Sequence, residues 1–166
     1  QHGIEIEQGR FEAMDLPHKH FDVVMMKYVL DHMETPFAAL QKARAVIADD
    51  GILCLADLIN VNSIAAKIFK DGHRLFHPMH FTYFSPKTVT DWVARAGFQV
   101  VRIDYPFLRT PYFNLSNLTT FASRAVRKLM NFSGSKTDPR VYSTAFYGSM
   151  MDVWAVPAKA SGRTCR

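Results

Sequence analysis

Histidine and aromatic side chains are concentrated in residues 71–83, which read Asp-Gly-His-Arg-Leu-Phe-His-Pro-Met-His-Phe-Thr-Tyr. Imidazole titrates near neutral pH, so His77 or His80 could remove a proton from a nucleophile or orient it, with Tyr83 beside them. The alternative, which the sequence leaves open, is that His80 bonds the backbone and fixes the loop. The segment is therefore the candidate catalytic region, with His77, His80 and Tyr83 as its residues.

A metal site is not expected there. Structural zinc sites combine Cys and His, and neither a Cys nor a paired carboxylate accompanies these histidines. The two cysteines, Cys54 and Cys165, have no metal-ligand spacing, and Cys54 lies in an apolar run where it is expected to be buried. We therefore expect no metal in this segment.

The elements that must position this segment read as alternating strands and helices. Ile4 and Ile6 alternate with glutamates and predict a short strand, and the apolar run at 21–26 predicts a central strand buried on both faces of a parallel sheet. Thr35 can cap a helix that starts at Pro36 and ends near residues 49–50. The next strand covers 52–56, which completes a βαβ unit.

The second half continues the pattern with a short helix at 64–69 and a helix that Ser85-Pro86 starts and Gly97 ends. Strands are expected at 98–105 and 144–156, and they could pair antiparallel at one sheet edge. An amphipathic helix at 115–130 and a loop at 134–139 lie between them. The fold class expected is α/β, a doubly wound, mostly parallel sheet with an antiparallel last strand.

Composition and charge narrow the function classes. The chain has 166 residues, 48% of them hydrophobic, which suits one core, and its formal charge is +5. The basic side chains do not form a stripe, and no Asn-Pro-Pro-aromatic signature is present, so neither nucleic acid nor membrane is expected as a partner. Without a leader or membrane span in the sequence, the expected location is cytoplasmic.

Six short segments, in order, resemble class I S-adenosylmethionine-dependent methyltransferases of the bacterial small-molecule group. They resemble the stretch after the third strand, the fourth strand, the Leu-Glu-His and Asp-Pro pattern, the passage into the fifth strand, the approach to the sixth strand and the last strand. The matching residues are Gln8 to Pro17, Phe21 to Val24, Tyr28 to Met33 with Thr35-Pro36, Asp49 to Leu53, His80 to Ser85 with Ala96 to Phe98, and Phe146 to Met151.

The resemblance implies S-adenosylmethionine as cofactor and a set of residues around it. Arg10 stands where the family often has an acidic residue that bonds the adenine amino group, so Glu12 or Asp15 could accept that bond instead. Phe11, the next residue, either stacks on adenine or is core. Four further residues are placed near the cofactor by the same motifs: Lys27 and Tyr28 beside the sulfonium, then Asp31 and His32 in the next turn.

The family's first strand, its Gly-x-Gly loop and the acidic residue that holds the ribose hydroxyls are not found in this sequence. The resemblance implies an N-terminally truncated Rossmann-like methyltransferase fold, inactive as the isolated fragment. The missing strands would lie between the strand at Ile4 and the one at Phe21. We expect the gap to be closed by re-pairing, to leave residues 1–17 poorly anchored, or to be filled by another copy, as a possible homo-oligomer.

The function predicted is methyl transfer to a small-molecule acceptor by a partial methyltransferase domain over residues 1–157, followed by a disordered tail over 158–166. Residues 105–142 are expected to be a lid or acceptor-side insertion. The alternative is a non-catalytic α/β module that binds a partner through its aromatic-histidine loop or its basic helix. The basic residues of that helix region are Arg124, Arg127, Lys128, Lys136 and Arg140.

Overall fold

The computed structural model describes residues 3, 5–108, 110–130 and 143–159. Its sheet has the strand order β1-β2-β4-β3, with β1 at Phe21–Lys27, β2 at Ile47–Ile59, β3 at Phe98–Asp104 and β4 at Met150–Pro157. β1 and β2 pair parallel, whereas β4 pairs antiparallel with both β2 and β3. Three strands therefore share one direction, and the expected mostly parallel sheet with an antiparallel last strand is confirmed.

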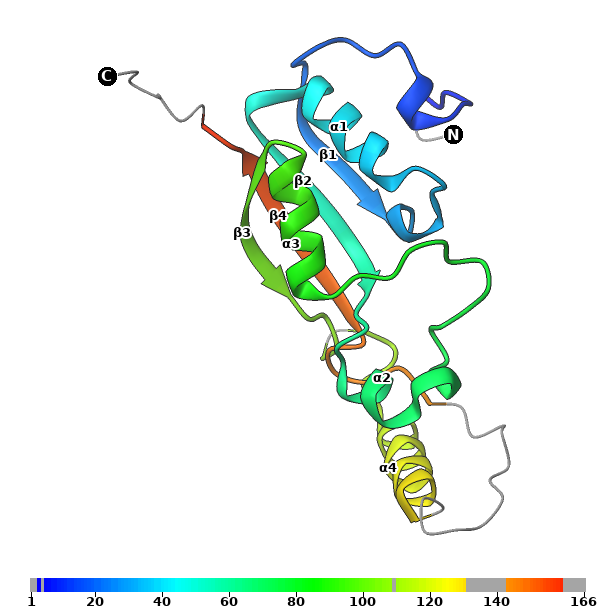
Figure 1. Ribbon diagram of the computed structural model, residues 1–166. Helices are drawn as coiled ribbons and strands as arrows, with labels where there is room; N and C mark the ends of the chain where they lie inside the picture. The colour runs from blue at the N-terminus through cyan, green and yellow to red at the C-terminus, as the bar shows by residue number, and fades with distance from the viewer. Residues whose placement is uncertain (1–2, 4, 109, 131–142, 160–166) are drawn as a thin grey trace.

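Two helices cover one face of this sheet. α1 (Pro36–Val46) and α3 (Pro86–Arg95) lie side by side on it (Figure 1). Fully buried side chains from both helices and the strands, among them Leu40, Leu53, Val93 and Met151, form the main core. Burial of this apolar surface is the main stabilising contribution to such a fold.

A smaller helical unit lies beyond the end of β2. α2 (Ile64–Phe69) and α4 (Leu115–Met130) pack together there (Figure 1). Their contact is a second apolar cluster in which the rings of Phe121 and Phe146 stack at 4.0 Å between centroids. Within the described residues, no helix is both long and apolar enough to cross a membrane.

The predicted central position of β1 is wrong. The strand lies at the sheet edge, with β2 as its described neighbour. Its inward side chains Val24 and Met26 join the core, but Val23 and Met25 are 56% and 59% exposed. They point to the face that α1 and α3 do not cover, so the continuous apolar run does not produce burial on both sides.

The predicted first strand and the predicted start of the last strand also differ from the structure. Residues 5–8 are described and form no strand, while Ile4 lies outside the described residues. In the C-terminal part, residues 144–149 form an irregular stretch, and β4 starts only at Met150. Ser149 stabilises that stretch because its hydroxyl accepts the Phe146 amide at 3.1 Å and its backbone carbonyl accepts the Asn60 amide. The loop predicted at 134–139 and most of the tail lie outside the described residues.

The junction of α1 and β2 was expected near residues 49–50, but α1 ends at Val46 and β2 begins at Ile47. The pairing register jumps from Phe21 with Ile47 to Val23 with Ile52, so β2 bulges in between. Gly51 sits in this bulge, where an added Cβ would lie 2.7 Å from the Ile47 side chain and 2.9 Å from a β1 carbonyl. The glycine therefore permits the close approach of β2 to β1.

Candidate functional site

The carboxyl ends of β1 and β2 meet at one edge of the sheet. Lys27 and Ala56 are register partners, and the Tyr28 amide donates to the Ala56 carbonyl at 3.2 Å. Tyr28 has a φ of +52°, a left-handed conformation that turns the chain sharply off the strand. The 3-10 helix η2 (Leu30–His32) follows at once. In an open α/β sheet, ligands bind beyond the carboxyl ends of the strands, so this edge, here called the rim, is the candidate site.

A cavity of about 450 Å³ opens on the rim. It lies between residues 9–12, which include the 3-10 helix η1 (Phe11–Ala13), and the chain that leaves β1. A second cavity of about 190 Å³ lies against the β1 side chains, and Phe11, Val29 and Met33 line both cavities. The lining of the larger cavity is Gly9, Arg10, Phe11, Glu12, Val29, His32, Met33, Glu34 and Phe81.

Ion pairs hold the two walls of this cavity together. The Arg10 guanidinium bonds the carboxylates of Glu12 at 3.0 Å and Glu34 at 3.1 Å. The Thr35 hydroxyl donates to the same Glu12 oxygen, again at 3.0 Å. A backbone amide, followed by the Arg10 guanidinium, lowers the pKa of Glu12. The carboxylate is therefore ionised and oriented at neutral pH.

Of the five predicted cofactor residues, Arg10, Phe11 and His32 line the same cavity. Lys27 and Tyr28 do not line it and contact the β2 and β4 side of the rim. The Lys27 ammonium lies 3.6 Å from the Asp57 carboxylate, and the Tyr28 hydroxyl donates to the Met150 sulfur at 3.5 Å. Desolvation raises the pKa of Tyr28 to about 12, so it is a neutral phenol at physiological pH.

The histidine-rich segment is fastened to the rim by its backbone. The amides of Phe81 and Thr82 both donate to the Asp31 carbonyl, at 2.9 and 3.3 Å. Nδ1 of His32 lies 3.1 Å from the Met79 carbonyl. These bonds bring His80 against η2, where its ring centroid is 4.3 Å from that of His32 and its Nε2 is 3.6 Å from the Asp31 carboxylate.

The three predicted catalytic residues also come together. The His80 ring lies 5.7 Å from Tyr83 and 6.4 Å from His77 between centroids. The Tyr83 hydroxyl donates to the His77 carbonyl at 2.9 Å, which holds the loop closed. His77 is exposed, whereas desolvation lowers the pKa of the more buried His80, with Asp31 opposing part of that effect.

One residue of the site had no role assigned to it from the sequence. Asp31 was placed in the turn with no role, although the structure buries it to 1% exposure beside two imidazoles. Its position in the Leu-Glu-His-like motif was the available signal. His73, in contrast, lies away from this cluster and bonds the Ser143 hydroxyl at 2.7 Å. No local pattern separated it from His77 and His80.

Fold and site together define a class. Three parallel strands, one antiparallel strand between the second and third, and a ligand-sized cavity at the carboxyl edge are the arrangement expected for the C-terminal part of a class I S-adenosylmethionine-dependent methyltransferase. A family model described as "Methyltransferase domain" matches residues 2–103. The chain belongs to this family, which confirms the predicted class and the cofactor of that class.

Solved structures share the fold. A S-adenosylmethionine-dependent methyltransferase of Thermotoga maritima, named as a possible histamine N-methyltransferase, matches with a TM-score of 0.64 and 14% identity over 93% of this chain and 65% of its own. The 1,6-didemethyltoxoflavin-N1-methyltransferase of Burkholderia thailandensis, solved with S-adenosylhomocysteine, matches with a TM-score of 0.51 and 13% identity over 90% of this chain and 48% of its own.

The magnesium protoporphyrin IX methyltransferase of Synechocystis, also solved with S-adenosylhomocysteine, matches with a TM-score of 0.50 and 12% identity over 90% of this chain and 49% of its own. The chain therefore spans about half to two thirds of the length of these three proteins. A search of the curated proteins finds no match.

Proposed function

We propose that this chain contributes the acceptor side and part of the cofactor site of an enzyme that transfers a methyl group from S-adenosylmethionine to a small molecule. The observation that carries the proposal is the cavity of about 450 Å³, which joins residues 9–12 to residues 29–34 at the carboxyl end of β1. Family membership supports the reaction class, and the two relatives solved with S-adenosylhomocysteine support the cofactor.

Phe11 and Glu12 are our candidates for the adenine contacts. Phe11 lines both cavities and is only partly buried, so its ring is available for stacking. Glu12 takes the acceptor role that the family gives to an acidic residue, because Arg10 and Thr35 already orient its carboxylate. Arg10 then acts as a positioning residue, while Lys27, Tyr28 and His32 border the methionine end.

The acceptor is assigned to the histidine-rich side. S-adenosylmethionine supplies an electrophilic methyl carbon, so the protein needs to align the nucleophile, exclude water and accept the proton that the nucleophile loses. His77 and His80, with Tyr83 fixing the loop, are the candidates for that proton. A third cavity of about 230 Å³ lies beyond the end of β2 and is lined partly by Asn60, Tyr105 and Tyr147. It is suited to a ring-shaped acceptor.

The chain by itself is expected to bind the cofactor weakly and to be inactive. Its sequence has no Gly-x-Gly loop to approach the methionine moiety and no acidic residue in the position that holds the ribose. Calorimetry with S-adenosylhomocysteine should therefore detect no tight binding to this chain. Micromolar affinity would contradict this part of the proposal.

Ultraviolet crosslinking of radiolabelled S-adenosylmethionine, followed by mapping of the labelled peptide, tests the site because it captures weak complexes. We expect label in residues 9–12 or 28–34, lost in Phe11→Ala and retained in Phe76→Ala, an aromatic variant away from the larger cavity. Label confined to other segments, or unaffected by Phe11→Ala, would overturn the proposal. Label on α4 would instead favour the alternative binding module, whose described basic residues include Arg127 and Lys128.

A further inference from the structure

The turn after β1 contains a buried carboxylate with no compensating bond. Asp31 is 1% exposed, and neither of its carboxylate oxygens has a hydrogen-bond partner among the residues that the structure describes. Nε2 of His80 lies 3.6 Å from this carboxylate, which is too long for a hydrogen bond. A buried carboxylate in this state is costly unless a cation or donor neutralises it.

We propose that Asp31, His32 and His80 bind one divalent transition-metal ion. His77 is then the candidate that accepts the proton of the nucleophile, because a nitrogen bound to a metal has no free lone pair. Each offers one ligand atom, and the three atoms lie within 4.8 Å of one another. Metal–ligand bonds of about 2.1 Å meeting at a tetrahedral angle separate two ligand atoms by about 3.4 Å. The 3.6 Å between Asp31 and His80 is close to that separation, so a metal fits between them with little movement.

Hydrogen bonds orient the His32 ring and fix the loop that carries His80. Nδ1 of His32 can donate to the Met79 carbonyl at 3.1 Å, which leaves its Nε2 lone pair for a metal. The Asp31 carbonyl accepts the amides of Phe81 and Thr82, which fixes the loop that carries His80. Outer bonds of this kind, a carbonyl behind a ligating imidazole above all, orient ligands in metal sites. The site thus joins two segments 48 residues apart in the sequence, His32 and His80.

The ligand set decides the class of metal. Two imidazoles and one carboxylate favour zinc, iron(II) and similar transition metals over calcium and magnesium, which prefer oxygen ligands. Three protein ligands leave at least one position for an exchangeable ligand. Because His32 also lines the cavity of about 450 Å³, a bound small molecule can occupy that position. The sequence did not indicate this site because Asp31 and His32 are distant from His80 along the chain and meet it only in the folded protein.

The proposal goes beyond methyl transfer and can be tested without S-adenosylmethionine. The chain is freed of metal with a chelator, desalted and titrated with Zn²⁺ by calorimetry, with Co²⁺ absorbance as a second probe. We expect one ion per chain and a Co²⁺ ligand-field spectrum. Asp31→Asn, which keeps the shape of the buried side chain, and His80→Gln should each weaken Zn²⁺ binding by at least about tenfold.

The matched control is His77→Gln, which removes a neighbouring exposed imidazole that is not part of the cluster. It should leave the affinity within about twofold of the unchanged chain, because only ligands and their supporting partners affect affinity strongly. Circular dichroism of each variant confirms folding, and His32→Gln provides a third test of the ligand set. The proposed site would be overturned if Zn²⁺ binding did not saturate or if Asp31→Asn left the affinity unchanged. It would also be overturned if His77→Gln lost as much affinity as the ligand variants.

Discussion

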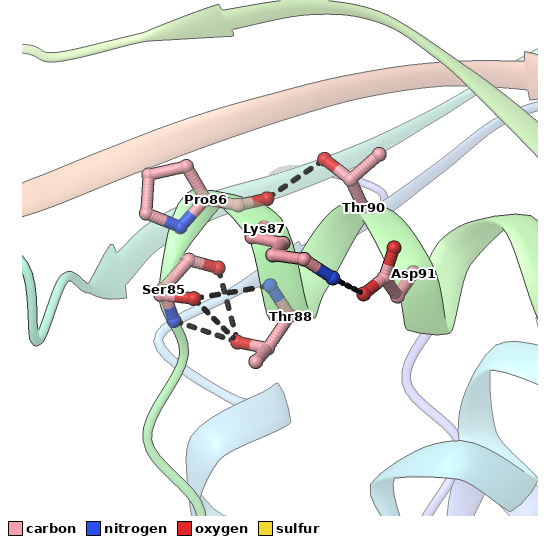
Figure 2. Close-up of polar contacts among 6 residues, drawn as sticks. All are labelled: Ser85, Pro86, Lys87, Thr88, Thr90 and Asp91. Atoms are coloured by element: carbon pink, nitrogen blue, oxygen red, sulfur yellow. Dashed lines mark hydrogen bonds and ion pairs between the residues drawn. The ribbon is translucent and has the colours of Figure 1, made fainter.

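Two helices begin with the same pair, a hydroxyl residue and a proline, yet the hydroxyls have different uses. Figure 2 shows Ser85 and Thr88 closing a capping box at the start of α3, with the Thr88 amide donating to the Ser85 hydroxyl at 3.0 Å and the Ser85 amide to the Thr88 hydroxyl at 2.8 Å. At α1 the described contacts of Thr35 include no such cap. Its hydroxyl donates instead to Glu12, which lines the cavity.

The residues just before the two caps differ in the same way. Phe84 is 1% exposed and packs edge-on against Trp92 of α3. Glu34 is exposed and pairs with Arg10 on the other wall of the cavity. The start of α3 is therefore stabilised by a capping box and a buried ring. At the start of α1, Thr35 and Glu34 instead bond residues 10–12 of the rim.

The largest expected difference in stability is between the residues that precede Ser85 and Thr35. Phe84→Ala should lower the free energy of unfolding by about 3–5 kcal/mol, because it removes a fully buried ring. Glu34→Ala should change it by less than about 0.5 kcal/mol, because exposed ion pairs contribute little. Urea denaturation of both variants measures the contrast. Equal losses would mean that the rim is as important to stability as the α3 side.

The histidine-rich segment contains the same contrast, since His73 lies buried beside Ser143 and His80 lies at the rim. Burial lowers the pKa of His73 to about 4, so below its ordinary value of about 6.5 the unfolded chain binds the extra proton and the folded chain does not. The free energy of unfolding should therefore fall by about 1.3 kcal/mol between about pH 7.5 and about pH 5.5.

This pH dependence is measured by urea denaturation at the two pH values, with His73→Gln as the comparison. The variant cannot titrate at this position, so its stability should depend less on pH over that range. A pH profile identical to that of the unchanged chain would show that His73 is not held neutral by burial.

Substitution of the two N-cap residues, Ser85 and Thr35, should give the next largest difference in stability. Ser85→Ala should destabilise the chain by about 1 kcal/mol, a usual value for loss of a cap. Thr35→Ala should cost less than about 0.5 kcal/mol, since Thr35 makes an exposed bond instead, but it should weaken crosslinking of S-adenosylmethionine because Glu12 loses a partner. Thermal unfolding and the crosslinking yield test both parts. A large destabilisation by Thr35→Ala would remove the distinction between the two helices.

The sequence predicted much of this arrangement where local signals decide it. The start of α3 at Ser85-Pro86 and the full extent of α4 follow from capping chemistry and helical periodicity. The use of Thr35 could not be predicted, because its partner Glu12 is 23 residues away in the sequence and meets it only in the folded chain. The edge position of β1 likewise depends on which strands neighbour it, which an apolar run does not specify.

The smallest expected effect is the loss of stability when Glu12 becomes protonated at acidic pH. The pKa of Glu12 lies below its ordinary 4.5, so its ionised form stabilises the folded chain above that pH, and this contribution is lost as the pH falls through the lowered value. The neutral hydroxyls of the Ser85 cap do not titrate. NMR between about pH 5.5 and about pH 3.5 should show the Thr35 amide shifting and the Thr88 amide unchanged. Glu12→Gln should abolish the Thr35 shift, and its persistence would assign the change to another group.

The most direct test of the rim as the ligand site is an NMR titration of the chain with S-adenosylhomocysteine to millimolar concentration. The account predicts shifts of the amides of residues 9–12 and 28–34, with those of residues 84–88 at the start of α3 unchanged. Shifts centred on α3 or α4, with the β1 rim unaffected, would contradict it.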